Sequence, residues 1–406
     1  MDAIIESALE YIQGHSQRIG EAVSIQGQLW NGGQPAIHPL LLTSDAPFYR
    51  DQHGEAVFNN QPKTHKQCPT TIGATHLPLH IPVYNPKEVH YDSDKMLKTG
   101  LNAAVRAAAG GMQAVPSVRA NMGCGIFPTL FGIKQDLFED KMPWVQQRLG
   151  KADLKKMGPE DLAFSDEFKA GLEHMDYMAA ALKGSACRVY PLDLQGPFDT
   201  AHLVYGDDIF YDLYDDPGFV HHLMALTCQA IFMGMDECLR HTPASEDGLF
   251  HYNNLYMPRS MGGIKISEDT STLLSKEHIQ EFVTPYTSMV LSRYSGGYIH
   301  YCGRNEHLYG EVMDMPLAFG INFGNPDMHD MAAVLKDCAA RDKIYYGALP
   351  MKDGELLSDY FTRCASDAYT EGRIHLLLMY HDGGAGCDDI SCIKEAWERA
   401  CASTLE

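Results

Sequence analysis

The second half of the chain alternates short apolar segments with longer amphipathic ones, and this order restricts the fold more than any other feature. Apolar runs at residues 298–303, 317–323, 343–349 and 375–381 are each followed by a segment with helical spacing. Because these runs are mostly apolar and do not alternate with polar residues, they predict strands that are covered on both faces. A repeated strand-then-helix order produces a parallel sheet, since each helix returns the chain to the same end of the sheet.

The same order extends less regularly toward the N-terminus. Further strands are predicted at about residues 79–84, 113–121, 187–195 and 264–269, which brings the number of strands to eight. Eight strand–helix units close into a (β/α)8 TIM barrel, and this is the α/β fold that we expect. A doubly wound open sheet is the alternative fold, but the chain lacks the glycine fingerprint that would support it.

The first 78 residues differ in character from the rest of the chain. Residues 2–23 have the apolar spacing of a docking helix, and residues 24–78 are irregular and rich in Gly, Pro, Gln and His. We therefore expect an N-terminal helix and irregular extension over residues 1–78 and the barrel over residues 79–406. The aromatic-rich segment at residues 250–263 is expected to be a hairpin or insert at the rim.

Composition excludes several classes of partner. The formal net charge of −21 disfavours nucleic acid and anionic membranes as partners. No apolar run approaches the roughly 20 residues that a membrane span needs, and the acidic start of the chain does not resemble a secretory signal. Eleven cysteines without framework spacing predict free thiols in a reducing compartment, so we expect a cytoplasmic protein. Six of them are expected to be ordinary buried thiols: Cys187, Cys228, Cys238, Cys338, Cys364 and Cys392.

A histidine and a cysteine lie at the end of the predicted strand at residues 298–303. His300 and Cys302 are two residues apart, so on a strand both point to the same side. Zn²⁺ accepts an imidazole and a thiolate at roughly 2.0–2.3 Å. The pair alone is a weak pattern, which a core histidine beside an inert cysteine also explains.

The barrel fold adds a third candidate ligand. Active sites of such barrels form at the C-terminal ends of the strands. Cys387 follows a run of glycines after the last predicted strand, which lets the backbone bend its sulfur toward the barrel axis. With His300 and Cys302 it would make a Cys₂His site whose fourth position is open or filled by a carboxylate such as Asp193 or Glu268. Three protein ligands and one exchangeable position are typical of a catalytic zinc.

Other polar side chains end the predicted strands. We take Asp193 and Glu268 as candidate catalytic residues. Candidate cofactor-binding residues are Asn121, Gln195 and Arg304.

Five segments, in this order along the chain, resemble the uroporphyrinogen decarboxylase superfamily. They are Asp193–Ala201 (DLQGPFDTA), Leu274–Glu277 (LSKE) with Phe282–Tyr286 (FVTPY), His300–Gly303 (HYCG) and Phe323–Pro326 (FGNP). Within the superfamily they look more like the cobalamin-linked methyltransferase branch than the decarboxylases, and the likeness covers roughly residues 90–400. In that branch a strand-borne His-x-Cys and a cysteine after the last strand bind zinc, and the matching positions are His300, Cys302 and Cys387.

The resemblance implies an activity and its cofactors. The expected reaction moves a methyl group between a methylcorrinoid, usually carried by a small partner protein, and a thiol or similar small acceptor. Zinc suits this chemistry, because a free thiol with a pKa of about 8.5 is mostly protonated at neutral pH and a bound zinc makes it a thiolate.

Two alternatives stay open. The first is a metal-free decarboxylase of a uroporphyrinogen-like acid. The decarboxylases carry an Arg-Gln-x-Gly-Arg strand near the N-terminus, and nothing like it precedes residue 112. The second is a barrel that binds a ligand without catalysis.

Overall fold

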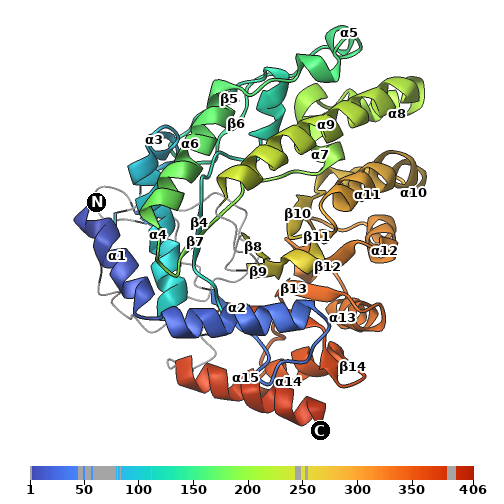
Figure 1. Ribbon diagram of the computed structural model, residues 1–406. Coiled ribbons are helices and arrows are strands. Elements are labelled where there is room, and N and C mark those ends of the chain that lie inside the picture. Colours follow the sequence, from blue (N-terminus) through green and yellow to red (C-terminus); the bar gives the residue numbers. More distant parts are fainter. Residues whose placement is uncertain are drawn as a thin grey trace.

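The computed structural model describes residues 2–43, 49–50, 56–57, 79, 81–82, 84–110, 112–242, 248–251, 255–381 and 390–406. Within them the chain has an α/β architecture in which most helices lie around the outside of the strands (Figure 1).

Six parallel strands form the main sheet, in the order β1–β16–β13–β12–β11–β10. Their bounds are Leu40–Thr43 (β1), Ile264–Ser267 (β10), Gly297–Tyr301 (β11), Ala318–Phe323 (β12), Ile344–Ala348 (β13) and Leu376–His381 (β16). Five of these strands fall on predicted ones. The parallel arrangement expected from the strand–helix order is therefore confirmed.

Two further strands, β4 (Ser117–Arg119) and β7 (Arg188–Tyr190), pair in parallel with each other. Contacts link this pair to both edges of the main sheet. After β7, Gln195 forms a parallel bridge with Ser267 of β10. Before β4, the backbone N–H of Gln113 donates to the carbonyl of Leu40 in β1 at 3.2 Å.

The helices follow the strands as the amphipathic segments predict. The longer helices are α1 (Ala3–Gln13), α2 (Ser16–Trp30), α4 (Ser93–Ala109), α6 (Asp166–Ala181), α7 (Pro197–Tyr205), α9 (Pro217–His241), α11 (Thr284–Arg293), α12 (Glu306–Asp314), α13 (Met331–Ala340), α14 (Leu357–Asp367) and α15 (Ile390–Leu405). Shorter helices are α3 (Pro86–Val89), α5 (Lys151–Leu154), α8 (Ile209–Asp215) and α10 (Lys276–His278). Asp92 caps α4 and Ser275 caps α10, because each side chain accepts a hydrogen bond from a backbone N–H of the first turn.

A separate apolar cluster lies on the inner side of the main sheet. It contains Trp30 of α2, Leu41 of β1, Tyr298 of β11 and Tyr346 of β13, together with Met257 of a hairpin formed by β8 (Gly248–His251) and β9 (Leu255–Pro258). The hairpin was expected in this region. Helix α2 and β9 thus cover the inner side of the strands.

The N-terminal region differs from its prediction. A first strand was expected at residues 79–84, but described residues in that range, including Ile81 and Pro82, are not in a strand. Proline lacks the N–H that a strand interior needs. The sheet instead uses β1, a Leu-Leu-Leu-Thr run inside the segment expected to be irregular. Because β1 pairs with β16, the region before residue 78 contributes a strand to the main sheet. The single docking helix predicted over residues 2–23 is two helices, α1 and α2.

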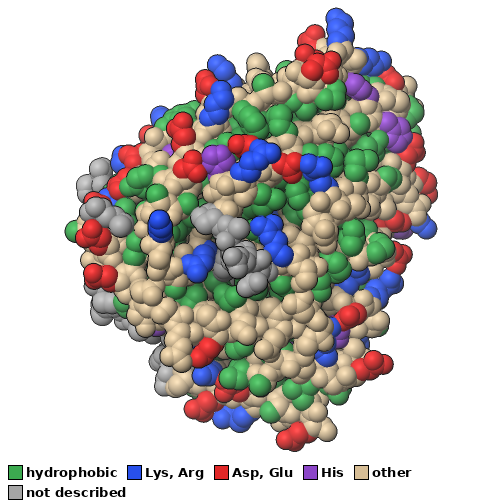
Figure 2. Space-filling model, viewed as in Figure 1, with side chains coloured by type: hydrophobic (Ala, Val, Ile, Leu, Met, Phe, Trp, Pro, Cys, Tyr) green, Lys and Arg blue, Asp and Glu red, His purple; other side chains and the backbone are tan. Residues whose placement is uncertain are grey.

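One helix in the described part of the chain, α9, is long and apolar enough to cross a membrane by length and composition, although no such run was expected. Sixty-one per cent of its most apolar window is buried. Such burial is also found in the core helices of soluble proteins. On the face shown in Figure 2, acidic and basic side chains lie interspersed among apolar ones.

Candidate metal centre

Three potential metal ligands converge where two neighbouring strands end. Asp269 follows β10, His300 lies near the end of β11 and Cys302 follows β11, and one ligand atom from each lies within 4.8 Å of the others. The His300 Nε2 atom is 3.7 Å from the Cys302 sulfur and 3.9 Å from the Asp269 Oδ1. The structure therefore places His300 and Cys302 side by side, as their spacing predicts.

The hydrogen bonds of His300 orient its ring. Asn322, its partner in the β11–β12 register, donates from its amide nitrogen to the carbonyl of Tyr346, so the amide oxygen faces His300. That oxygen can only accept, which requires the proton of His300 on Nδ1. The lone pair on Nε2 therefore remains available as a metal ligand, and Nε2 lies on the side of Cys302 and Asp269. Burial and the positive charge of Lys265 lower the pKa of His300, which favours the neutral, ligating form.

The loop around Cys302 is held on both sides. The backbone N–H of Cys302 donates to the Asp269 carboxylate, and the N–H of Gly303 donates to the Asn325 side chain at 2.9 Å. A side chain at position 324 would not fit, because a Cβ on Gly324 would lie 2.4 Å from the Cys302 sulfur. The glycine and asparagine of the Phe-Gly-Asn-Pro segment therefore shape the site.

Burial and a neighbouring charge set the protonation state of Cys302. Partial desolvation and the neighbouring Asp269 carboxylate raise the pKa of the Cys302 thiol to about 12. Without a metal, the sulfur is protonated at neutral pH. The donor set of one oxygen, one nitrogen and one sulfur fits Zn²⁺, which would stabilise the thiolate.

The third predicted ligand, Cys387, lies outside the described residues. Sequence reasoning took Asp193 or Glu268 as the carboxylate, whereas the structure brings Asp269 to the group. Strand alternation could have found it. Ser267 is the register partner of His300, so Asp269, two residues further, returns to the same side of the strand.

Glu268 lies on the other side of that strand. Its carboxylate is fully buried and accepts hydrogen bonds from Thr287 at 2.6 Å and Ser271 at 2.8 Å. Burial raises its pKa to about 7. Nearby, the buried Asp199 accepts the backbone N–H groups of Asp269 and Thr270 at 2.8 and 2.7 Å. Both carboxylate oxygens of Glu268 thus accept a hydrogen bond from a neighbouring hydroxyl group, and its catalytic role stays a prediction.

Asp193 lies in a cluster of charges beside the group. Its Oδ1 is 3.2 Å from the Lys265 Nζ and 3.3 Å from the Arg119 Nη1. Burial opposes ionisation of Asp193, but the positive charges of Lys265 and Arg119 outweigh it and lower the pKa to about 2. Asp193 is thus an ionised partner of two cations.

The three residues predicted to bind a cofactor have different surroundings. Gln195 is buried and donates to Asp193 at 3.4 Å. The amide nitrogen of Asn121 lies 3.5 Å from the Met142 sulfur, and its buried amide oxygen makes no hydrogen bond with the described residues. Arg304 is exposed and pairs with Glu306 at 2.7 Å. Of these three residues, only Gln195 makes a hydrogen bond to Asp193 in the part of the chain that the structure describes.

The cysteines largely follow expectation. Five of the six predicted buried thiols are free and buried. The sixth, Cys392, is instead disulfide-bonded, which the cysteine spacing does not reveal.

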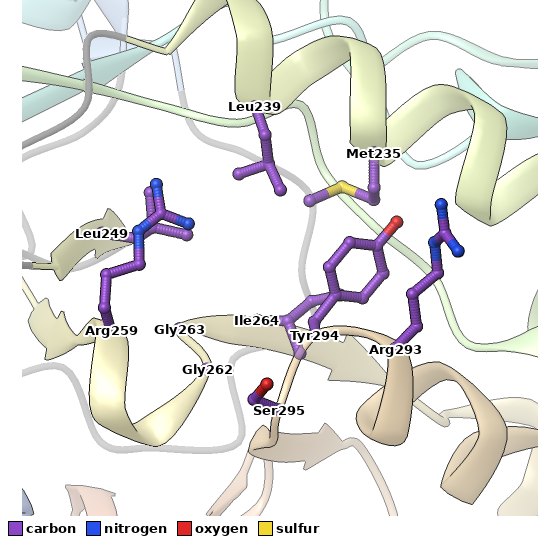
Figure 3. Close-up of a pocket in the computed structure, with 10 residues that line it drawn as sticks. All are labelled: Met235, Leu239, Leu249, Arg259, Gly262, Gly263, Ile264, Arg293, Tyr294 and Ser295. Atoms are coloured by element: carbon purple, nitrogen blue, oxygen red, sulfur yellow. The ribbon is translucent and has the colours of Figure 1, made fainter.

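A separate pocket of about 230 Å³ lies at the opposite end of β10, where Ile264 begins the strand (Figure 3). Arg259 and Arg293 stand on opposite sides of it, and Met235 and Leu239 of α9 line it from above in this view. Arg293 is paired with Asp236 of α9. The pocket is therefore distinct from the metal-ligand group.

No protein-family model matches the chain, and no curated protein matches it either. The likeness to the uroporphyrinogen decarboxylase superfamily thus depends on the five sequence segments described above.

Proposed function

We propose that the protein is a zinc-dependent methyltransferase on a closed (β/α)8 barrel. It would move a methyl group between a methylcorrinoid, carried on a small partner protein, and a thiol or similar small acceptor. The observation that carries this proposal is the convergence of Asp269, His300 and Cys302 at the C-terminal ends of neighbouring parallel strands.

The closed barrel is supported by contacts at both edges of the six-stranded sheet. The Gln195–Ser267 bridge joins the chain after β7 to β10, and the Gln113–Leu40 bond joins the chain before β4 to β1. With β4 and β7 paired, these contacts are those that a ring of eight parallel strands would make. In such a barrel the metal ligands lie at the mouth, where active sites of this fold form.

The described residues supply a binding and orienting frame for the reaction. Asp269, His300 and Cys302 would hold the zinc, with Cys387 as the further ligand that the family resemblance implies. When bound, zinc lowers the pKa of a coordinated acceptor thiol and so supplies a thiolate nucleophile. Asn322 fixes the His300 tautomer, and the Asp199 and Asn325 side chains hold the loops that carry Asp269 and Cys302. We further propose a cytoplasmic location, which agrees with the burial of α9.

The proposed activity is tested by incubating the zinc-loaded protein with methylcobalamin and a panel of small thiols. The cobalamin absorption spectrum reports loss of the methyl group. We expect thiol-dependent demethylation that is lost in Cys302→Ser, because this change removes one zinc ligand. Demethylation at the rate of the protein-free reaction, or release of CO₂ from uroporphyrinogen by the metal-free protein, would contradict the proposal.

A further inference from the structure

A second cavity lies at the other end of strand β10, away from the metal ligands. Ile264 begins β10 and lines this pocket of about 230 Å³, whereas Asp269 follows the last residue of the strand, Ser267. At about 3.3 Å per residue, the strand separates the two places by roughly 10 Å. None of the three metal-ligand candidates lines the pocket, so it is a separate site.

One wall of the pocket is apolar and is held by close backbone packing. Gly262, before β10, has a φ of 77°, and a Cβ there would collide with the carbonyl oxygens of Tyr294 and Gly296. The turn before β10 and the loop before β11 thus lie backbone against backbone. Leu249 and Ile264 line the same pocket and are 3% and 2% exposed. Because the wall is packed in this way, the hollow is part of the fold.

The two arginines at the pocket differ in their partners. Arg293 forms an ion pair with Asp236 of α9, and the hydroxyl of Tyr294 donates to the same carboxylate at 3.0 Å. The side chain of Arg259 makes no ion pair or hydrogen bond with any other described residue. No described residue that lines the pocket is Asp or Glu. The pocket therefore carries one positive charge, that of Arg259, without an acidic partner in the described part of the chain.

The surroundings of Arg259 suit an amphipathic molecule. In Figure 3 the ring of Tyr294 stands between the two arginines with its hydroxyl on the Arg293 side, and Leu239 extends from α9 toward the pocket. A guanidinium offers N–H donors in a planar fork that matches the two oxygens of a carboxylate. The leucines that line the pocket favour a hydrocarbon group, which leaves water on binding. The pocket volume is about eight times the roughly 30 Å³ of one water, which is room for about eight non-hydrogen atoms.

We propose that this pocket binds a small carboxylate with a branched apolar body of about four to six carbons. The carboxylate pairs with Arg259, and the body packs against Leu239, Leu249 and the ring of Tyr294. The inference does not rest on the proposed methyl transfer, because no metal ligand takes part in it.

Titration with 4-methylpentanoate, followed by NMR of isotope-labelled methionine methyl groups, tests this site. Met235 lines the pocket, and its signal is the one that Met235→Leu lacks. We expect 4-methylpentanoate to shift this signal saturably, and to bind at least tenfold more tightly than the neutral 4-methylpentanamide or acetate. The amide keeps the shape without the charge, and acetate keeps the charge without the body. A Met235 signal that no probe shifts, or equal affinities for the carboxylate and its amide, would overturn the inference.

An arginine variant with a matched control assigns the charge. Arg259→Gln should bind 4-methylpentanoate at least tenfold more weakly and should no longer distinguish it from the amide, because the unpaired charge is gone. Arg399→Gln removes an exposed arginine of α15 and should bind as the wild type does. An unchanged affinity in Arg259→Gln would also refute the site.

Cys302→Ser separates this inference from the proposed function. We expect it to bind 4-methylpentanoate with the affinity of the wild type, since Cys302 does not line the pocket. An affinity that falls at least tenfold in Cys302→Ser would place the carboxylate at the metal and contradict the inference. Failure of methyl transfer with retained binding would remove the proposed function and leave this site standing.

Discussion

His300 and Asn322 face each other across the β11–β12 pair, and the Nδ1–H of the imidazole donates to the amide oxygen. The bond fixes the tautomer that leaves Nε2 as a ligand. Partners of this kind outside the metal shell are worth about 10- to 100-fold in metal affinity. We therefore expect Asn322→Leu to weaken zinc binding by about that factor, measured by competition with a chromogenic chelator. Asn322→Asp keeps an acceptor and should lose less; equal affinity in both variants and the wild type would contradict this role.

The carboxylate beside His300 and Cys302 is that of Asp269, whereas the sequence favoured Asp193 or Glu268. Asp269→Asn should lower zinc affinity at least tenfold, because an amide carries no charge to balance the dication. Glu268→Gln and Asp193→Asn are the matched controls, and both should retain zinc within about threefold, since neither carboxylate belongs to the Asp269–His300–Cys302 group. A larger loss of zinc in either control than in Asp269→Asn would reverse the assignment.

The secondary structure and the site residues could be predicted from the sequence where the pattern of apolar residues is regular, and not where it is irregular. Long strand–helix units around His300 and Cys302 were predictable, because uninterrupted apolar runs and capped amphipathic segments leave few alternatives. The choice between Glu268 and Asp269 could also be made from the sequence, because successive side chains of a strand point to opposite faces and only Asp269 lies on the face of His300. Strand β1 was not predictable in the same way. Four residues among prolines and glycines carry little periodicity, and only pairing with β16 makes them a strand.

Gly320 allows α2 to pack against the sheet. A Cβ at this position would lie 2.9 Å from the Trp30 ring and 2.8 Å from the Ile344 carbonyl. Gly320→Ala should therefore destabilise the protein by about 1–3 kcal/mol through overpacking. Gly310→Ala is the control, since nothing lies within 4 Å of its Cβ in α12, and it should be neutral or stabilising by up to about 1 kcal/mol. Urea unfolding of both variants measures the difference, and equal effects would argue against close packing at Gly320.

His38 makes stability depend on acidity. It is buried, its Nε2–H donates to the Leu376 carbonyl at 2.6 Å, and its own carbonyl accepts from Trp397 of α15. Burial lowers its pKa from 6.5 to about 4 despite the bond to Leu376. Between these values the unfolded chain binds the proton and the folded chain does not, so stability falls as the pH drops from 6.5 to 4.

The contribution of His38 to this loss is up to about 3 kcal/mol. Urea unfolding at several pH values gives the free energy of unfolding as a function of pH. Between pH 6.5 and 4 this free energy should fall less steeply with decreasing pH for His38→Gln than for the wild type. His307 is exposed, so His307→Gln serves as a control and should show the same pH dependence of the free energy of unfolding as the wild type. An unchanged slope in His38→Gln would assign the acid sensitivity to other groups.

The metal content of the purified protein decides whether Asp269, His300 and Cys302 hold zinc. The wild type, purified without added zinc and analysed by mass spectrometry for metals, should contain close to one zinc per chain. Cys302→Ser should contain much less at a similar unfolding temperature. A wild type without bound metal, or a zinc content that Cys302→Ser leaves unchanged, would contradict the account.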